Sequence, residues 1–192
     1  MFNRSVTLRG LVLLTGICLF SGAIRAADGP EFVGFAGGAT YGGGLGTHGL
    51  FGGGGSFRIA NNIRLLGEFG YSPIGSASVS GGGVSASASA HLFDFGGGAD
   101  YSFLSPTSKA RPYFVGVVGG EHLTANLSVT GSGISPASAS GSLNAVYWGF
   151  GGGLRYSIGK GWGIKPEIRY QHSVNTGNTV LFTVGGFFRA GE

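Results

Sequence analysis

The stretch AVYWGFGGGLRYSIGKGWGIKPEIRYQH, residues 145–172, decides the fold. Every second residue from Val146 to Ile158 is apolar or glycine, and the residues between them are smaller or polar. After the turn Gly159-Lys160-Gly161 the alternation resumes and runs from Trp162 to Tyr170. A period of two on both sides of a tight turn predicts a β-hairpin.

The two faces of this hairpin differ in polarity. One face is apolar and ends in aromatic residues, whereas the other carries Arg155, Lys165, Glu167 and Arg169. The apolar face is long and continuous in a chain of which only 10% is charged. This pattern favours lipid outside the sheet and a polar interior.

The N-terminal residues have the composition of a secretory signal peptide. Two arginines precede an apolar run from Gly10 to Phe20, and small residues follow it. Such a run is too short to span a bilayer as a helix. We therefore predict a signal peptide over residues 1–26, with cleavage after Ala23 as the alternative, and one mature domain over residues 27–192.

The predicted mature domain has little net charge and no cysteine. Three of the twelve Lys and Arg lie in the signal peptide and none of the eight acids does, so the net charge falls from +4 to +1. This balance gives no reason to expect a nucleic-acid partner. Cys18 follows the bulky Ile17, which disfavours a lipoprotein signal. Removal of the signal peptide also removes this cysteine, so the mature domain has no disulfide framework.

Alternating segments of this kind recur along the chain and predict eight strands. Two segments without charge, residues 73–90 and 126–144, are rich in Ser, Gly and Ala and are expected to be long loops. The connections near Asn61, Lys109 and Lys160 are short. The expected strands cover residues 31–41, 48–59, 63–71, 91–103, 112–123, 145–158, 162–172 and 179–189.

Short turns at one end and longer loops at the other are typical of an outer-membrane barrel with both termini in the periplasm. The strands are long enough to cross the hydrocarbon when tilted, since about 9–11 residues suffice. Closure would leave no unpaired strand edge in lipid. The predicted fold is therefore all-β, an eight-stranded antiparallel up-and-down transmembrane β-barrel.

Aromatic residues near both strand ends are expected to face lipid as two interfacial girdles. This assignment places the odd-numbered residues of the first strand (33–41) and of the fifth strand (113–119) on the outside. The expected girdles are Tyr41, Phe51, Tyr71, Trp148 and Tyr170 at the loop end, and Phe57, Tyr101, Tyr113, Tyr156, Trp162 and Phe188 at the turn end.

The opposite faces of the strands carry charges of both signs. The interior of an eight-stranded barrel is about wide enough for side chains to fill, and buried charges there must pair. We predict a polar network that plugs the lumen, formed by Arg58, Arg64, Glu68, Asp94, Asp100, Arg155, Lys165, Glu167 and Arg169. Small residues also expected to face inward leave a narrow ion path as the alternative; these are Gly34, Ala36, Gly149, Gly151 and Gly153.

The chain resembles the OmpA/OmpX and opacity-type outer-membrane barrels over residues 31–189. The resemblance is carried by GFAGGATY, HLFDFGGGADYSF, RPYFVGVVGG, the hairpin quoted above and TVLFTVGGFFR. It implies an outer-membrane β-barrel in a Gram-negative-type bacterium. Such barrels commonly end on an aromatic residue that the assembly machinery recognises, whereas Ala190-Gly191-Glu192 follow Arg189 here.

No catalytic, cofactor or metal site is predicted. The glycine runs lack a P-loop lysine, and the four histidines lack metal-ligand spacing. The segment 169–175 looks similar to PagL-type lipid A deacylases, which carry a histidine and, two residues later, a serine. Here Val174 takes the serine position after His172, and Ser173 points to the other face.

These observations predict a non-enzymatic barrel that serves as a membrane scaffold or as a surface-exposed interaction protein. The alternatives are a small passive pore and, less favoured, a lipid A deacylase-like hydrolase. The expected partners are outer-membrane lipid and, during biogenesis, the barrel-assembly machinery and periplasmic chaperones. The uncharged loops identify no surface partner, and no cofactor is expected.

Overall fold

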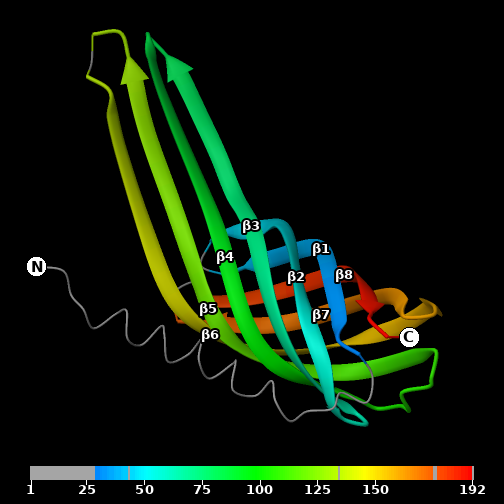
Figure 1. Cartoon of the computed structure of the whole chain (residues 1–192). Helices are drawn as coiled ribbons and strands as arrows, with labels where there is room; N and C mark the ends of the chain where they lie inside the picture. Colours follow the sequence, from blue (N-terminus) through cyan, green and yellow to red (C-terminus); the bar gives the residue numbers. More distant parts are fainter. Residues whose placement is uncertain (1–28, 43, 134, 175–176, 192) are drawn as a thin grey trace, which may run out of the picture.

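The computed structural model describes residues 29–42, 44–133, 135–174 and 177–191, and the predicted signal peptide lies outside them. The strands form one closed antiparallel barrel in chain order (Figure 1). The predicted eight-stranded up-and-down barrel is confirmed. The strands are β1 (Glu31–Tyr41), β2 (Gly46–Ala60), β3 (Ile63–Gly81), β4 (Val84–Ser102), β5 (Ala110–Gly131), β6 (Ala137–Gly159), β7 (Trp162–Ser173) and β8 (Gly177–Arg189).

β1 and β8 close the barrel. Their ladder runs from Glu31 opposite Arg189 to Tyr41 opposite Thr179, and β1 pairs with β2 along its other side. Both sides of β1 are therefore paired over its whole length. Closure of this kind satisfies the backbone where lipid offers no hydrogen-bonding partner.

The strand period of two separates side chains that face outward from those that face the lumen. Phe69, Phe95 and Phe182 are more than half exposed on the outside, whereas Arg64 and Arg155 are buried inside. An apolar exterior around a charged interior suits a hydrocarbon environment.

The two segments predicted to be loops are strands instead. β3 continues to Gly81 before β4 begins at Val84, and β5 continues to Gly131 before β6 begins at Ala137. The four strands stay paired to their tips and project beyond the barrel as one sheet, coloured cyan to yellow in Figure 1. The loop prediction is wrong because Gly and Ala are singly poor strand formers, whereas pairing among four neighbours satisfies the backbone of all of them.

β1 and β5 face the opposite way from the prediction. Tyr41 and Tyr113 are buried inside the barrel, and the phenylalanines at even-numbered positions of both strands are about half exposed outside. The charges account for this orientation. Glu31 is in phase with Tyr41 and Arg111 is in phase with Tyr113, and a charged side chain is less costly in the polar lumen than in lipid.

Gly98 allows β4 and β5 to approach each other. A Cβ added at Gly98 would lie 2.0 Å from the carbonyl oxygen of Gly116, well inside contact distance. At Gly116 an added Cβ would have no described atom within 4 Å. The two paired strands thus offer one glycine that packing requires and one that it does not.

We expect Gly98→Ala to lower the free energy of unfolding by about 1–3 kcal/mol, because the backbone must move to admit the methyl group. Gly116→Ala is the matched control and should be neutral or stabilising by up to about 1 kcal/mol. Urea unfolding in lipid vesicles, followed by tryptophan fluorescence, measures both. Equal losses in the two variants would contradict the steric explanation.

Candidate functional site

The lumen contains two groups of buried ionic contacts, and the first surrounds Glu31 at the turn end. Glu31 accepts hydrogen bonds from Arg155 Nε and Arg189 Nε, each at 2.9 Å. Arg155 also donates to both carboxylate oxygens of Asp100, at 2.7 and 3.1 Å. Arg64 Nη2 lies 3.7 Å from Glu31. This turn-end cluster ties β1 to β3, β4, β6 and β8.

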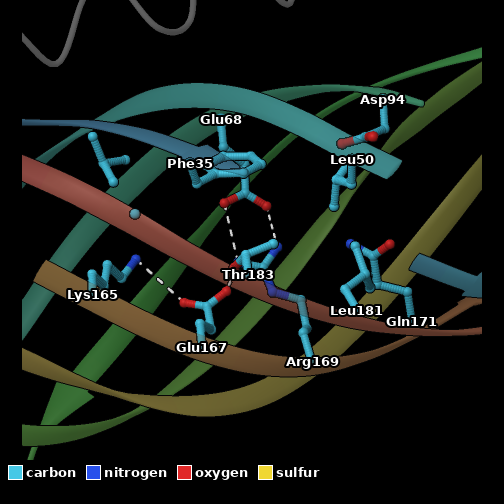
Figure 2. A pocket seen from close by; sticks show the side chains of 12 residues that line it. Phe35, Leu50, Glu68, Asp94, Lys165, Glu167, Arg169, Gln171, Leu181 and Thr183 are labelled. Atoms are coloured by element: carbon cyan, nitrogen blue, oxygen red, sulfur yellow. Dashed lines mark hydrogen bonds and ion pairs between the residues drawn. The ribbon is translucent and has the colours of Figure 1, made fainter. Parts of the chain in front are cut away.

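The second group, the central cluster, surrounds Arg169 (Figure 2). Arg169 donates to both carboxylate oxygens of Glu68 and, at 2.5 Å, to Glu167. Glu167 also accepts a hydrogen bond of 2.6 Å from the Tyr113 hydroxyl, and Lys165 Nζ lies 3.3 Å from it. Glu167 is therefore a shared acceptor for two cations and a phenol.

The two ends of the lumen differ in their balance of charge. Cations outnumber acids at the turn end, and acids outnumber cations toward the projecting sheet. The turn-end residues are Arg58, Arg64, Arg111, Arg155 and Arg189 with Glu31 and Asp100; those further along are Lys165 and Arg169 with Glu68, Asp94, Glu121 and Glu167. An ion of either sign would meet like charge along this path.

An apolar layer lies at the end of the lumen next to the projecting sheet. The Tyr41 hydroxyl within it donates to Ser72 Oγ at 2.7 Å, so its polar atom is satisfied. Ala90 and Leu123 pack against this layer and extend it onto the projecting sheet. Its buried members are Ala39, Tyr41, Leu50, Ile74, Leu92 and Leu181.

All nine residues predicted to line the lumen point into the barrel, and seven of them belong to the turn-end and central clusters. Arg58 is buried at the turn end. Asp94 also faces inward, but no described side chain forms a hydrogen bond or ion pair with it (Figure 2). Four further charged residues face inward that were not predicted from the sequence, namely Glu31, Arg111, Glu121 and Arg189. The alternation could have identified them, because each is adjacent in sequence to an outward-facing apolar or glycine residue and therefore belongs to the inner face.

Little space remains between these side chains. The cavity drawn in Figure 2 has a volume of about 30 Å³, enough for one or two water molecules. The inward glycines of β6 do not enlarge it. A Cβ at Gly153 would lie 2.4 Å from the Tyr113 hydroxyl, and one at Gly149 would lie 2.7 Å from Gln171 Cγ.

The outer surface carries aromatic residues near both ends of the spanning strands. Tyr41 and Tyr113 were wrongly assigned to it, because both lie inside the barrel. Trp148 lies with Phe150, Tyr170 and His172 in one ring cluster. The predicted girdle residues that face outward are Phe51, Phe57, Tyr71, Tyr101, Trp148, Tyr156, Trp162, Tyr170 and Phe188.

The candidate Ser–His pair is not assembled. His172 faces outward with Nδ1 2.7 Å from Asn178 Oδ1, whereas Ser173 is buried and donates to Glu121. Within the described residues, no group of three His, Cys, Asp or Glu side chains could hold a metal ion. The described part of the chain has no helix long and apolar enough to cross a membrane.

No protein-family profile matches the sequence, and no curated protein matches it significantly. Solved structures do match. Ail of Yersinia pestis, in complex with the heparin analogue sucrose octasulfate, aligns with a TM-score of 0.58 and 16% identity, covering 84% of this chain and 99% of Ail. The fold is that of an eight-stranded outer-membrane β-barrel.

Two further barrels give the same result. Neisserial surface protein A aligns with a TM-score of 0.55 and 16% identity over 84% of this chain and 97% of its own. A major outer membrane protein from Thermus thermophilus aligns with a TM-score of 0.55 and 13% identity over 83% and 99%. The predicted resemblance to barrels of the OmpA/OmpX type is thereby confirmed for the fold.

We expect Glu167→Gln to lower the free energy of unfolding by about 3–5 kcal/mol, because it leaves Arg169 and Lys165 buried without their shared carboxylate. If water screened the central cluster, the loss would fall to about 1 kcal/mol or less. Urea unfolding in lipid vesicles measures the difference.

Asp94→Asn is the matched control for this substitution. It removes an inward carboxylate that forms no hydrogen bond or ion pair with another described side chain, so stability should stay equal or rise. A loss as large as that of Glu167→Gln would show that carboxylate removal in general, and not the shared pairing, is responsible.

Proposed function

We propose that this protein is a non-enzymatic outer-membrane barrel whose spanning part is a closed anchor and whose projecting sheet is displayed at the cell surface. Both termini then lie in the periplasm, at the end with the short turns. The observation that carries this proposal is the filled lumen, in which paired charges and an apolar layer occupy the space that a channel would need.

Closure of the lumen is supported by three independent features. The side chains of Glu167 and Arg155 are held by bonds from several strands, so they do not swing aside singly. The cavity of about 30 Å³ beside Glu167 and Arg169 holds one or two water molecules, which is too few for a continuous water file. The apolar layer around Leu50 and Leu92 adds a barrier in which the Tyr41 hydroxyl is already bonded to Ser72, so the layer offers little to replace an ion's hydration.

Surface display is supported by the surroundings of the projecting sheet. β3 to β6 continue well past the outward aromatic residues Tyr71, Phe93 and Trp148, so their tips stand clear of the hydrocarbon. Residues 73–90 and 123–144 carry no charged side chain. Ail was crystallised with a sulfated heparin analogue, but a polyanion needs basic side chains, so this sheet is suited to an uncharged partner.

A passive pore is the second candidate function. It was favoured by small residues expected to face the lumen, but Gly34 and Ala36 face outward, and the space beside Gly153 is occupied by Tyr113. Asp94, which lies beside the cavity without a described ionic partner, is the feature that favours it. We therefore rank the closed anchor first.

Planar-bilayer recording tests the closed anchor directly. The mature protein, recovered from the outer membrane of a Gram-negative host, should give no steady conductance in detergent-free bilayers. Glu167→Gln should also stay silent, because the apolar layer does not depend on that carboxylate. Steady, ion-selective conductance of the unmodified protein would contradict the closed anchor and favour the passive pore.

Cysteine labelling in intact cells tests the orientation. In a chain with Cys18→Ser, a cysteine at Ser132, in the tip between β5 and β6, should react with a membrane-impermeant maleimide. A cysteine at Thr107, in the turn between β4 and β5, should react only after the outer membrane is permeabilised. The reverse pattern would invert the proposed orientation.

A further inference from the structure

The projecting sheet reverses the polarity of the barrel from which it grows. Within the barrel, each strand is apolar outside and polar inside. In the projecting sheet, residues paired across the four strands form rows, and the rows that continue the outer face are hydroxyl and amide residues, as in Ser78–Ser87–Ser128–Ser138. The rows that continue the inner face are apolar, as in Ala77–Ala88–Leu127–Ala139 and Val79–Ala86–Val129–Ala137.

This inner face is hollow and, in the proposed orientation, lies in water. A pocket of about 670 Å³ extends along it, from Ile74 next to the barrel to Leu127 and Ala139 on the projecting strands. Leu127 is 48% exposed and Val79 is 74% exposed. We call the surface formed by Ile74, Ala77, Ala88, Ala90, Ala125, Leu127 and Ala139 the alanine groove.

The groove is continuous with the apolar layer at the end of the lumen. Ala90 lines the groove and also packs against the buried cluster of Leu50, Leu92 and Leu181. A largely apolar floor therefore runs from the barrel mouth onto the projecting sheet, and the pocket along it is also lined by Ser76, Ser89, Asn126 and Ser140. Because β1, β2, β7 and β8 end near the mouth, they do not cover this face (Figure 1).

The size of the groove argues against a second copy of the chain as its occupant. Four strands about 4.8 Å apart, rising about 3.3 Å per residue over about seven residues, give a face of roughly 400 Å². Two such faces would bury about 800 Å² in total, below the roughly 1,200–2,000 Å² of specific interfaces. The volume of the pocket instead falls within the range of small-molecule sites, about 300–1,000 Å³.

The chemistry of the lining selects the ligand. No charged side chain lies in residues 73–90 or 123–144, so a charged group entering the groove would lose its hydration without compensation. The four polar residues of the lining, Ser76, Ser89, Asn126 and Ser140, form one row that continues the outer face. The inner-face rows are alanine, glycine and leucine, and this shallow apolar floor suits a flexible hydrocarbon chain. A chain already in the bilayer would gain nothing by moving there, whereas one arriving from water would gain its full burial.

We propose that the alanine groove binds the hydrocarbon chain of an amphiphile that reaches the cell surface from the aqueous side. The polar head of the ligand remains in water beyond the groove, and the hydroxyl face of the sheet stays solvated on the other side. This proposal rests on the proposed function only for its orientation, because the groove must be on the side of the membrane that the amphiphile reaches.

Photo-crosslinking in nanodiscs tests the groove where both sides of the membrane are accessible, so failure would be distinct from failure of the orientation. The full-length chain with Cys18→Ser is incubated with a fatty acid that carries a diazirine at its chain end, and adducts are mapped by mass spectrometry. Adducts are expected on residues 74–90 and 123–141, besides those on the lipid-facing belt. Leu127→Asn should lower the groove adducts about tenfold relative to the belt adducts, because it places an amide on the apolar floor.

Ser128→Asn, one residue away on the hydroxyl face, is the matched control and should leave the groove adducts unchanged. Heat-dependent gel mobility shows that each variant keeps a closed barrel. Adducts confined to the belt, or groove adducts that persist in Leu127→Asn, would overturn the proposal. Disulfide-linked dimers of a Leu127→Cys variant, formed without groove adducts, would overturn it in favour of a second copy.

Discussion

Closure of the ladder between β1 and β8 is the constraint on which the rest of this structure depends. In hydrocarbon, an unpaired backbone amide costs several kcal/mol, so a spanning sheet must have no edge. Glu31 and Arg189 face each other across this seam and are joined by a hydrogen bond of 2.9 Å. Glu31 also binds Arg155, so the same carboxylate that marks the seam anchors it to the far wall. Backbone closure and charge pairing thus stabilise one another.

The phase of each strand determined how far the fold could be predicted. In six strands the outward positions hold large aromatic or aliphatic side chains and the inward ones hold charge, so sequence alone orients them. β1 and β5 have apolar residues on both faces, and aromatic content alone misled the assignment of Tyr41 and Tyr113. The terminal charges Glu31 and Arg111 would have resolved both, because a charge in lipid costs more than a phenol in the lumen.

The candidate site was predictable as a set of residues but not as a set of bonds. Arg169 and Glu68 are 101 positions apart, and Arg155 and Glu31 are 124 apart. These pairs cross the lumen, so they depend on the stagger of the closed sheet and on the length of the side chains. The alternation along each strand shows which face a residue occupies, but it does not show its partner. The same limit applies to Asp94, which shares its phase with paired acids but forms no hydrogen bond or ion pair with a described side chain.

In the projecting sheet, the alternation of apolar and polar side chains depends on the surrounding medium as well as on the strand. Along β4 the outward residues change from Phe95 and Phe93 to His91, Ser89 and Ser87 while pairing with β5 continues unbroken and β3 shifts register between Pro73 and Gly75. That change marks the level at which lipid gives way to water. One face of the projecting sheet carries hydroxyl groups and the opposite, inner face is apolar. Beyond the barrel, no other described strand lies opposite this inner face. Small alanine side chains keep the exposed area low, which lets the sheet stand alone in water while it retains an uncharged surface that a hydrocarbon chain can cover.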